Sequence, residues 1–326
     1  MRRLPIVLIL SLLAVTPLSA AVLDDFDDVS DWIAAPSDGV ELRISSERGA
    51  MRLDFDFYGG AGYAIARKPV KLQLPSDYEF TFRMRGEAPP NTLEFKLLDP
   101  SGDNVWWLNQ RNRTFPRAWT KQRILKRHIE FAWGPSGGAP LTEISALEIV
   151  ITASTGGKGT IWIDDLVFHE REARPANPPE PHGPWRGREE LLVDFGTPHE
   201  FGGMTLEWER HASDYNVEMS LDRQTWEKVA TVRGSTGGRD PLFLPDSDAR
   251  YVRVRMPRGS YSLKSVTFEP LAFGASRNAF FTHIAGRERR GLYPRYFMNE
   301  QSYWTIVGEV GEECEALLNE DGALEL

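Results

Sequence analysis

Apolar and polar side chains alternate along most of this chain with a period of two residues. The pattern is clear at 51–57, 80–84 and 93–97, where Met, Leu and Phe take every second position and charged residues or Thr lie between them. Because successive side chains of a β-strand point to opposite faces, each stretch predicts a strand with one buried and one exposed face.

Turn-forming residues separate these stretches. Residues 89–91 and 99–103 are rich in Pro, Gly, Asp and Asn, and segments with a helical period are almost absent. Many short strands with turn signals between them indicate an antiparallel β-sandwich. The last strand of this unit is predicted at 159–168.

A proline-rich linker divides the chain. Four prolines lie within 174–181, and a second alternating series follows over 189–270. Proline cannot donate to a sheet ladder and favours a stiff, extended linker. The sequence therefore predicts an all-β protein with two consecutive sandwich domains, at 22–170 and 189–270, joined by a linker at 171–188.

The first residues are typical of a targeting segment. Arg2 and Arg3 precede an apolar run over 4–15, and small residues follow at 19–21. The run is shorter than the ~20 residues of a membrane span, so we interpret 1–21 as a signal peptide; an uncleaved helix is the alternative. The prediction is a secreted or periplasmic protein without a transmembrane segment, in which Cys314 is a lone thiol.

Composition and charge exclude some classes of protein. The 326 residues carry a formal net charge of -9, and the single cysteine rules out an intrachain disulfide. An acidic chain is not expected to coat nucleic acid. The 10 tryptophans are unusually many and need an explanation by core packing or by ligand binding.

The second domain resembles the discoidin family, also called the coagulation factor 5/8 type C or galactose-binding-like jelly roll. The matching positions are Val193–Gly196, Phe201–Met204, Asp214–Ser220, Asp222 with Trp226, and Ala249–Arg253. Arg223 departs from the family pattern, because that turn usually has Gly. The family's calcium site is not carried over, because much of the N-terminal region that binds it is missing here.

The first domain resembles a related jelly roll, shared by carbohydrate-binding modules and the complex I intermediate-associated proteins. The likeness rests on Leu23–Phe26 with Trp32 and on Gly159–Phe168. The resemblance implies adjacent first and last strands and a structural calcium ion, for which Asp25 and Asp165 offer hard oxygen ligands. Solvated carboxylates at strand ends are the alternative.

The segment 103–135 holds the main ligand candidates. Trp106 and Trp107 are adjacent, so on a strand they point to opposite faces, and an exposed indole can stack on a sugar ring. Asn109, Arg111 and Arg113 add groups that fix hydroxyls. Seven basic residues and no acid lie within 111–127, which allows an anionic polysaccharide. The alternatives are core packing of both indoles and a solvated charged face.

In the second domain, ligands of jelly rolls usually meet the loops at one end. His211, Tyr215, Arg239 and Asp240 are the candidates there, with ordinary solvated loops as the alternative. Fold analogy does not choose the ligand, since discoidin domains recognise sugars, phospholipids and proteins.

No catalytic motif is present. The six histidines lack metal-ligand spacing, and neither an H-E-x-x-H nor a G-x-S-x-G motif occurs. The segment 271–326 resembles the opening of the catalytic part of large secreted six-hairpin glycosidase-like proteins. This predicts a truncated further β-rich domain, with a short C-terminal subdomain as the alternative.

The sequence predicts a secreted, non-catalytic carbohydrate-binding protein that directs a partner hydrolase to polysaccharide. One alternative is an adhesion or scaffold protein whose discoidin domain binds a protein or a membrane surface. Another is a glycoside hydrolase fragment with residual activity on a sandwich face.

Overall fold

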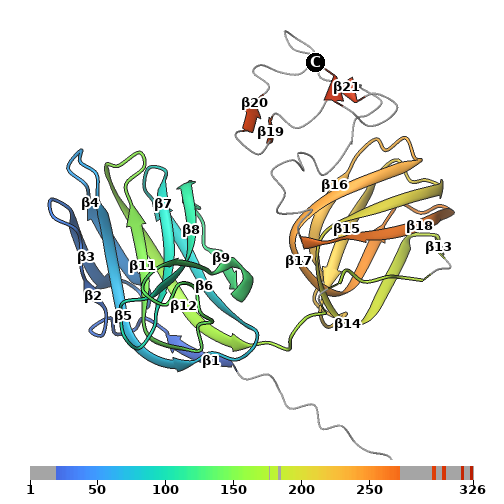
Figure 1. The fold of residues 1–326 in the computed structure, drawn as a ribbon. Coiled ribbons are helices and arrows are strands. Elements are labelled where there is room, and N and C mark those ends of the chain that lie inside the picture. The colour runs from blue at the N-terminus through green and yellow to red at the C-terminus, as the bar shows by residue number, and fades with distance from the viewer. Residues whose placement is uncertain are drawn as a thin grey trace, which may run out of the picture. The chain divides into compact units, whose positions relative to one another are not determined.

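The computed structural model describes residues 20–175, 177–182 and 185–271, together with short strands at 296–298, 303–305, 317–318 and 324–325. The predicted signal peptide (except Ala20 and Ala21), Cys314 and most of the predicted C-terminal domain lie outside the described residues. The chain divides into two compact units, Met1–Ala173 and Arg174–Leu326 (Figure 1). In the part described, no helix is long and apolar enough to cross a membrane.

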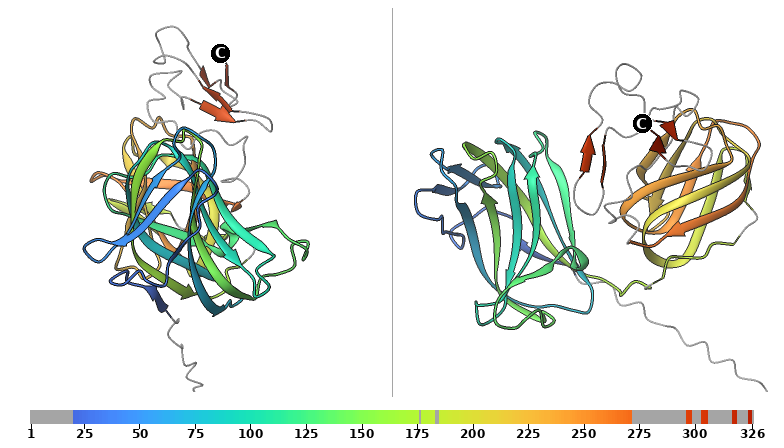
Figure 2. Two further views of the ribbon diagram at one scale, coloured as in Figure 1. Left: turned by 90° about the vertical axis from the view of Figure 1, so that its left-hand side faces the viewer. Right: turned by 45° about the horizontal axis from the view of Figure 1, so that its top comes forward.

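Unit 1 is a sandwich of two antiparallel sheets (Figures 1 and 2). The first, called the β6 sheet, has the order β3-β4-β12-β6-β9, with β1 paired to β12. Its strands are β1 (Ala20–Asp24), β3 (Glu41–Ser46), β4 (Met51–Asp56), β6 (Tyr78–Glu87), β9 (Thr120–Leu125) and β12 (Lys158–Glu170).

The second sheet of unit 1, called the β7 sheet, has the order β10-β8-β7-β11-β5-β2. Its strands are β2 (Ile33–Ala34), β5 (Tyr63–Gln73), β7 (Asn91–Leu98), β8 (Val105–Arg113), β10 (Glu130–Trp133) and β11 (Glu143–Thr152). A short 3-10 helix, η1 (Lys126–His128), connects β9 to β10.

The predicted alternation produces the core of unit 1. On β4, Met51, Leu53 and Phe55 are buried between the sheets, whereas Arg52 and Asp54 lie on the outer face and form an ion pair. The central aromatic contact across the sandwich joins Phe80 of β6 to Phe95 of β7, with ring centroids 5.1 Å apart. Burial of these alternate apolar residues stabilises the unit, at about 25 cal/mol per Å² of apolar area.

Unit 2 is built on one six-stranded antiparallel sheet with the order β13-β18-β14-β17-β15-β16. Its strands are β13 (Arg186–Gly187), β14 (Glu190–Arg210), β15 (Tyr215–Ser220), β16 (Glu227–Val232), β17 (Arg239–Arg255) and β18 (Tyr261–Glu269). β14 and β17 pair over three stretches with irregular register between them, and the sheet curls around one core (Figure 1). The predicted all-β fold of consecutive sandwiches is thus confirmed.

Short strands also lie in the C-terminal region. β19 (Tyr296–Met298) pairs with β20 (Tyr303–Thr305), and β21 (Leu317–Leu318) pairs with β22 (Leu324–Glu325).

Candidate functional site

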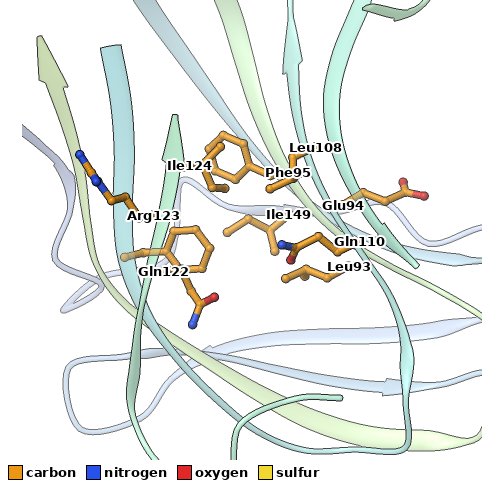
Figure 3. Close-up of a pocket in the computed structure, with 10 residues that line it drawn as sticks. Leu93, Glu94, Phe95, Leu108, Gln110, Gln122, Arg123, Ile124 and Ile149 are labelled. Carbon is orange, nitrogen blue, oxygen red and sulfur yellow. The ribbon is translucent and has the colours of Figure 1, made fainter. Parts of the chain in front are cut away.

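The interior of unit 1 is too tightly packed to hold an organic ligand. The cavity drawn in Figure 3 has a volume of about 20 Å³ and is lined mainly by apolar side chains such as Phe95, Leu108 and Ile124. That is room for about one water molecule. Figure 3 also shows Glu94 and Arg123 pointing away from the cavity in opposite directions, toward the outer faces of the two sheets. A sugar therefore does not fit this cavity, and the outer faces of the sheets are the surfaces to consider.

The outer face of the β7 sheet carries a row of polar side chains that crosses four strands. Trp107 on β8 lies opposite Lys96 on β7, Lys96 lies opposite Glu148 on β11, and Glu148 lies opposite Arg67 on β5. Cross-strand neighbours have Cβ atoms ~5 Å apart, so these four side chains are successive neighbours across the face. The next row contains Glu94.

Charged side chains on this face are unusually buried. Glu94, Lys96 and Glu148 are 5%, 7% and 3% exposed, and β7 is buried on both of its faces. Each charge has a partner: Lys96 Nζ lies 2.8 Å from Glu94 Oε2, and Arg67 Nη2 lies 2.5 Å from Glu148 Oε1. A buried charge is tolerated only when it is paired and hydrogen-bonded. Glu94, Lys96, Glu148 and Arg67 therefore form two ion pairs on this face, and together they carry no net charge.

Two indoles border this array. Trp107 and Trp133 of β10 meet edge to face with ring centroids 5.3 Å apart, and the Lys96 ammonium lies 5.7 Å and 5.2 Å from the two rings. Trp133 remains 46% exposed. A flat, exposed ring beside fixed hydrogen-bonding groups can hold the apolar face of a sugar while the polar groups bind its hydroxyls.

Trp106 has the opposite environment. It is 8% exposed, and its ring packs edge-on against Phe131 with centroids 5.3 Å apart. Because it follows the alternation of β8, it points to the side away from Trp107. The prediction that Trp106 is a surface platform for a sugar is therefore corrected, because its ring is buried and packs against Phe131.

The polar candidates on β8 divide between the two faces. Asn109 donates to Glu94 Oε1 at 3.4 Å, and its own Oδ1 is buried with no partner among the described residues. This acceptor lies in the second row, opposite Glu94, and is itself covered by neighbouring atoms. Arg111 is exposed, one step further along the strand.

Arg113 lies on the inner side of β8. It donates to the amide oxygens of Gln110 and Gln122, the latter at 2.5 Å, and both glutamines line the interior cavity. Burial lowers the pKa of the Arg113 guanidinium. The role predicted for Arg113 in contacting a ligand hydroxyl is corrected, because the side chain closes the sandwich edge between β8 and β9.

In unit 2, two predicted ligand residues belong to the core. Asp240 is fully buried, and its Oδ2 accepts hydrogen bonds from Trp208 Nε1 at 2.9 Å, Tyr215 Oη at 2.8 Å and Ser235 Oγ at 2.5 Å. Tyr215 is 2% exposed. The prediction of surface contacts by Tyr215 and Asp240 is corrected, because both serve a buried hydrogen-bond network. His211 and Arg239 are exposed.

The two carboxylates proposed for calcium have local partners. Asp25 Oδ1 accepts the Asp27 backbone N–H at 3.2 Å, and Asp165 Oδ2 lies 2.7 Å from Arg83 Nε. No group of three or more His, Cys, Asp or Glu side chains among the described residues is arranged to hold a metal ion. Arg83 is shared by Asp164 and Asp165, so a calcium ion at Asp165 would have to compete with this guanidinium. The calcium site stays a prediction.

Sequence reasoning missed Trp133, Glu94, Lys96 and Glu148 as site residues. The sequence signals for three of them are the polar positions Glu94 and Lys96, which alternate with apolar residues on β7, and Glu148, the one glutamate inside the apolar run 144–151. Strands that are buried on both faces are usually apolar throughout. A charged residue in such a strand therefore indicates that one of its faces is buried by polar neighbours.

The fold and this face define an all-β protein of two sandwich units, one of which presents a polar and aromatic sheet face. Residues 170–266 match the model of the F5/8 type C domain, the family that the second domain was expected to resemble. No curated protein matches the chain.

Several solved structures are similar to parts of the chain. A family 11 carbohydrate-binding module from Clostridium thermocellum, in complex with a β-1,3-1,4-mixed-linked tetrasaccharide, is 17% identical over 47% of this chain and 96% of its own, with a TM-score of 0.38. A chitosan-binding module of the chitosanase/glucanase from Paenibacillus sp. IK-5 is 28% identical over 26% and 73%, with a TM-score of 0.23. The agarase AgWH50C is 11% identical over 48% and 25%, with a TM-score of 0.34.

Proposed function

We propose that unit 1 binds an uncharged oligosaccharide or polysaccharide on the outer face of the β7 sheet, and that the protein acts as a secreted, non-catalytic targeting component for a polysaccharide-degrading partner. The observation that carries the proposal is the row of buried, mutually paired charges beside the Trp107–Trp133 pair. This array presents hydrogen-bonding groups and apolar rings together, which is the combination that a sugar requires.

The pairing of the charges favours an uncharged ligand. Glu94 and Glu148 are each neutralised by a cation within 2.8 Å, so the row offers neither a free anion nor a free cation at its centre. The buried Oδ1 of Asn109 has no hydrogen-bond partner among the described residues, and a sugar hydroxyl that gains access to it would donate one. Satisfying a buried acceptor contributes to affinity because leaving it without a partner costs about 1–3 kcal/mol.

The test is calorimetric titration of the purified chain with soluble neutral glycans such as mixed-linkage β-glucan and galactomannan. Trp133→Ala and Trp107→Ala are each expected to weaken binding about tenfold or more, since each removes one stacking contact of roughly 1–2 kcal/mol. Trp119→Ala is the matched control, because Trp119 is similarly exposed at 40% but lies on the β6-sheet side of the unit.

Two outcomes contradict this assignment. Unchanged affinity in both Trp107→Ala and Trp133→Ala removes the β7-sheet face as the site. Loss of binding in Trp119→Ala alone moves the site to the other sheet. The non-catalytic part of the proposal has a separate measurement: release of reducing sugar from the same glycans by the purified chain would overturn it.

A further inference from the structure

The seven basic residues of 111–127 do not form one surface. Arg111 lies on β8 in the β7 sheet, Arg113 is held between two glutamines, and Arg123 Nε pairs with Glu79 Oε2 at 2.5 Å. Lys126 Nζ donates to the Ser76 carbonyl at 2.6 Å. Arg127 contacts the neighbouring His128 side chain.

Arg117 and Lys121 remain, and they flank Trp119. Both are exposed, and neither has a carboxylate within ion-pair distance among the described residues. Trp119 itself is 40% exposed at the start of β9. An exposed indole thus lies two residues from each of two unpaired cations.

Two arginine side chains lie over Trp119, and both are also paired with carboxylates of the β6 sheet. The guanidinium carbons of Arg83 and Arg85 lie 5.4 Å and 5.6 Å from its ring centroid, and Arg85 also lies 3.7 Å from the ring of Trp162. Arg85 is therefore shared by two indoles. Cation–π contacts of this kind fix the orientation of the ring and leave the rest of its surface open.

Lys121 lies directly opposite Arg83 across the β6–β9 pair. Like charges at directly opposed positions are unfavourable in a sheet. The carboxylates nearby, Asp164 and Asp165, both pair with Arg83, and none reaches Lys121. The ammonium group of Lys121 therefore has no anionic partner of its own among the described residues, and an anion that binds there supplies one.

We propose that the Trp119 patch, made of Trp119, Arg117 and Lys121 on the outer side of the β6 sheet, is a second ligand site that takes a sugar carrying a carboxylate or sulfate group. The ring of the sugar stacks on the free surface of Trp119, and its anionic group meets Lys121 and Arg117. Charge complementarity selects this ligand: the β7-sheet row has its charges paired, whereas this patch has two cations without partners.

The experiment measures retention of the purified chain in native gels cast with polygalacturonate or dextran sulfate, compared with mixed-linkage β-glucan. Trp119→Ala and Lys121→Gln are each expected to weaken polyanion binding on the order of tenfold and to leave β-glucan binding unchanged. Trp133→Ala should have the reverse effect, so failure of this inference is distinguishable from failure of the proposed function.

Varying the ionic strength and adding other polyanions tests whether binding depends on charge and on recognition of the sugar. Raising the ionic strength from 0.05 to about 0.5 M should abolish polyanion binding, because the cations are exposed and screened by salt. The control variant Lys71→Gln removes an 86% exposed lysine from the other sheet and should retain polyanion binding. Polyanion binding that survives in both Trp119→Ala and Lys121→Gln overturns the proposal, and so does equal binding of single-stranded DNA, which would show attraction by charge without recognition of sugar.

Discussion

The hydroxyl of Tyr78 makes the stability of unit 1 depend on alkaline pH. Tyr78 is 2% exposed, and its ring lies against Phe80 and Phe168. Burial, with a smaller contribution from the charge of Asp77, raises the pKa of Tyr78 to about 12. In the unfolded chain a tyrosine titrates near pH ~10. The folded state therefore holds the phenolic proton more tightly than the unfolded state does.

Stability contributed by this proton is fully present below about pH 10 and is lost as the pH rises toward 12. The full loss is on the order of 2–3 kcal/mol, at ~1.4 kcal/mol per pKa unit. Urea unfolding of the wild type and of Tyr78→Phe between about pH 8 and 11 checks this, because the variant has no proton to lose. Parallel pH profiles for the two proteins would contradict the assignment.

Other residues show how neighbours in sequence acquire different roles. Trp106 and Trp107 have the same chemistry and adjacent positions, yet one ring packs against Phe131 and the other joins Trp133 on the outer face. Alternation predicts that they diverge, but it does not assign the faces. That assignment needs the pairing of β8 with β7, because the partner strand determines which side is the core.

At the scale of elements, one buried ion pair ties the two sheets of unit 1 together. Lys68 on β5 lies with its Nζ 2.8 Å from Oδ2 of Asp24 on β1, and both side chains are largely buried. Asp24 also accepts hydrogen bonds from the Phe26 backbone N–H and from Trp32 Nε1. Lys68 thus supplies the cation for this buried carboxylate.

Lys68→Met is expected to destabilise unit 1 by about 3–5 kcal/mol, because it leaves a buried carboxylate without its cation. Lys71→Met on the same strand is the matched control and should change stability by less than about 1 kcal/mol, since Lys71 is 86% exposed. Denaturant midpoints of the two variants measure the difference. Equal midpoints would show that the Asp24–Lys68 pair contributes no more than a surface pair.

Strand register also creates the candidate site. Trp107, Lys96, Glu148 and Arg67 come from positions spread over 67–148, and only the pairing of β8, β7, β11 and β5 places them in one row. A shift of any of these strands by one residue would turn its side chain toward the core. The site therefore depends on the sheet and not on any local motif.

At the scale of the whole molecule, the two units have separate hydrophobic cores. We predict two unfolding transitions, each moved by substitutions in its own unit. Arg223 in the unit 2 turn has a φ of +64°, which is costly for a residue with a side chain. Arg223→Gly is expected to stabilise unit 2 by about 0.5–1 kcal/mol, because glycine adopts this backbone freely.

Calorimetry of the full chain measures this effect. The transition of unit 2 should rise by a few degrees, roughly 4–8 °C per kcal/mol for a domain of this size, while the transition of unit 1 stays in place. Gln224→Gly next to it is the control and should lower the same transition, since Gln224 does not have a positive φ. A shift of both transitions by Arg223→Gly would contradict independent unfolding.

The sequence by itself determined the strands and the division into two sandwiches, because alternation and turn chemistry are local properties. The family motifs of the second domain also anticipated the match of residues 170–266 to the F5/8 type C model. It also determined that Trp106 and Trp107 diverge. Only the tertiary structure decided which ring is free, that Tyr215 and Asp240 are buried, and which cations of 111–127 lack partners. Those outcomes depend on contacts between strands far apart in the chain, and a local pattern carries no information about register.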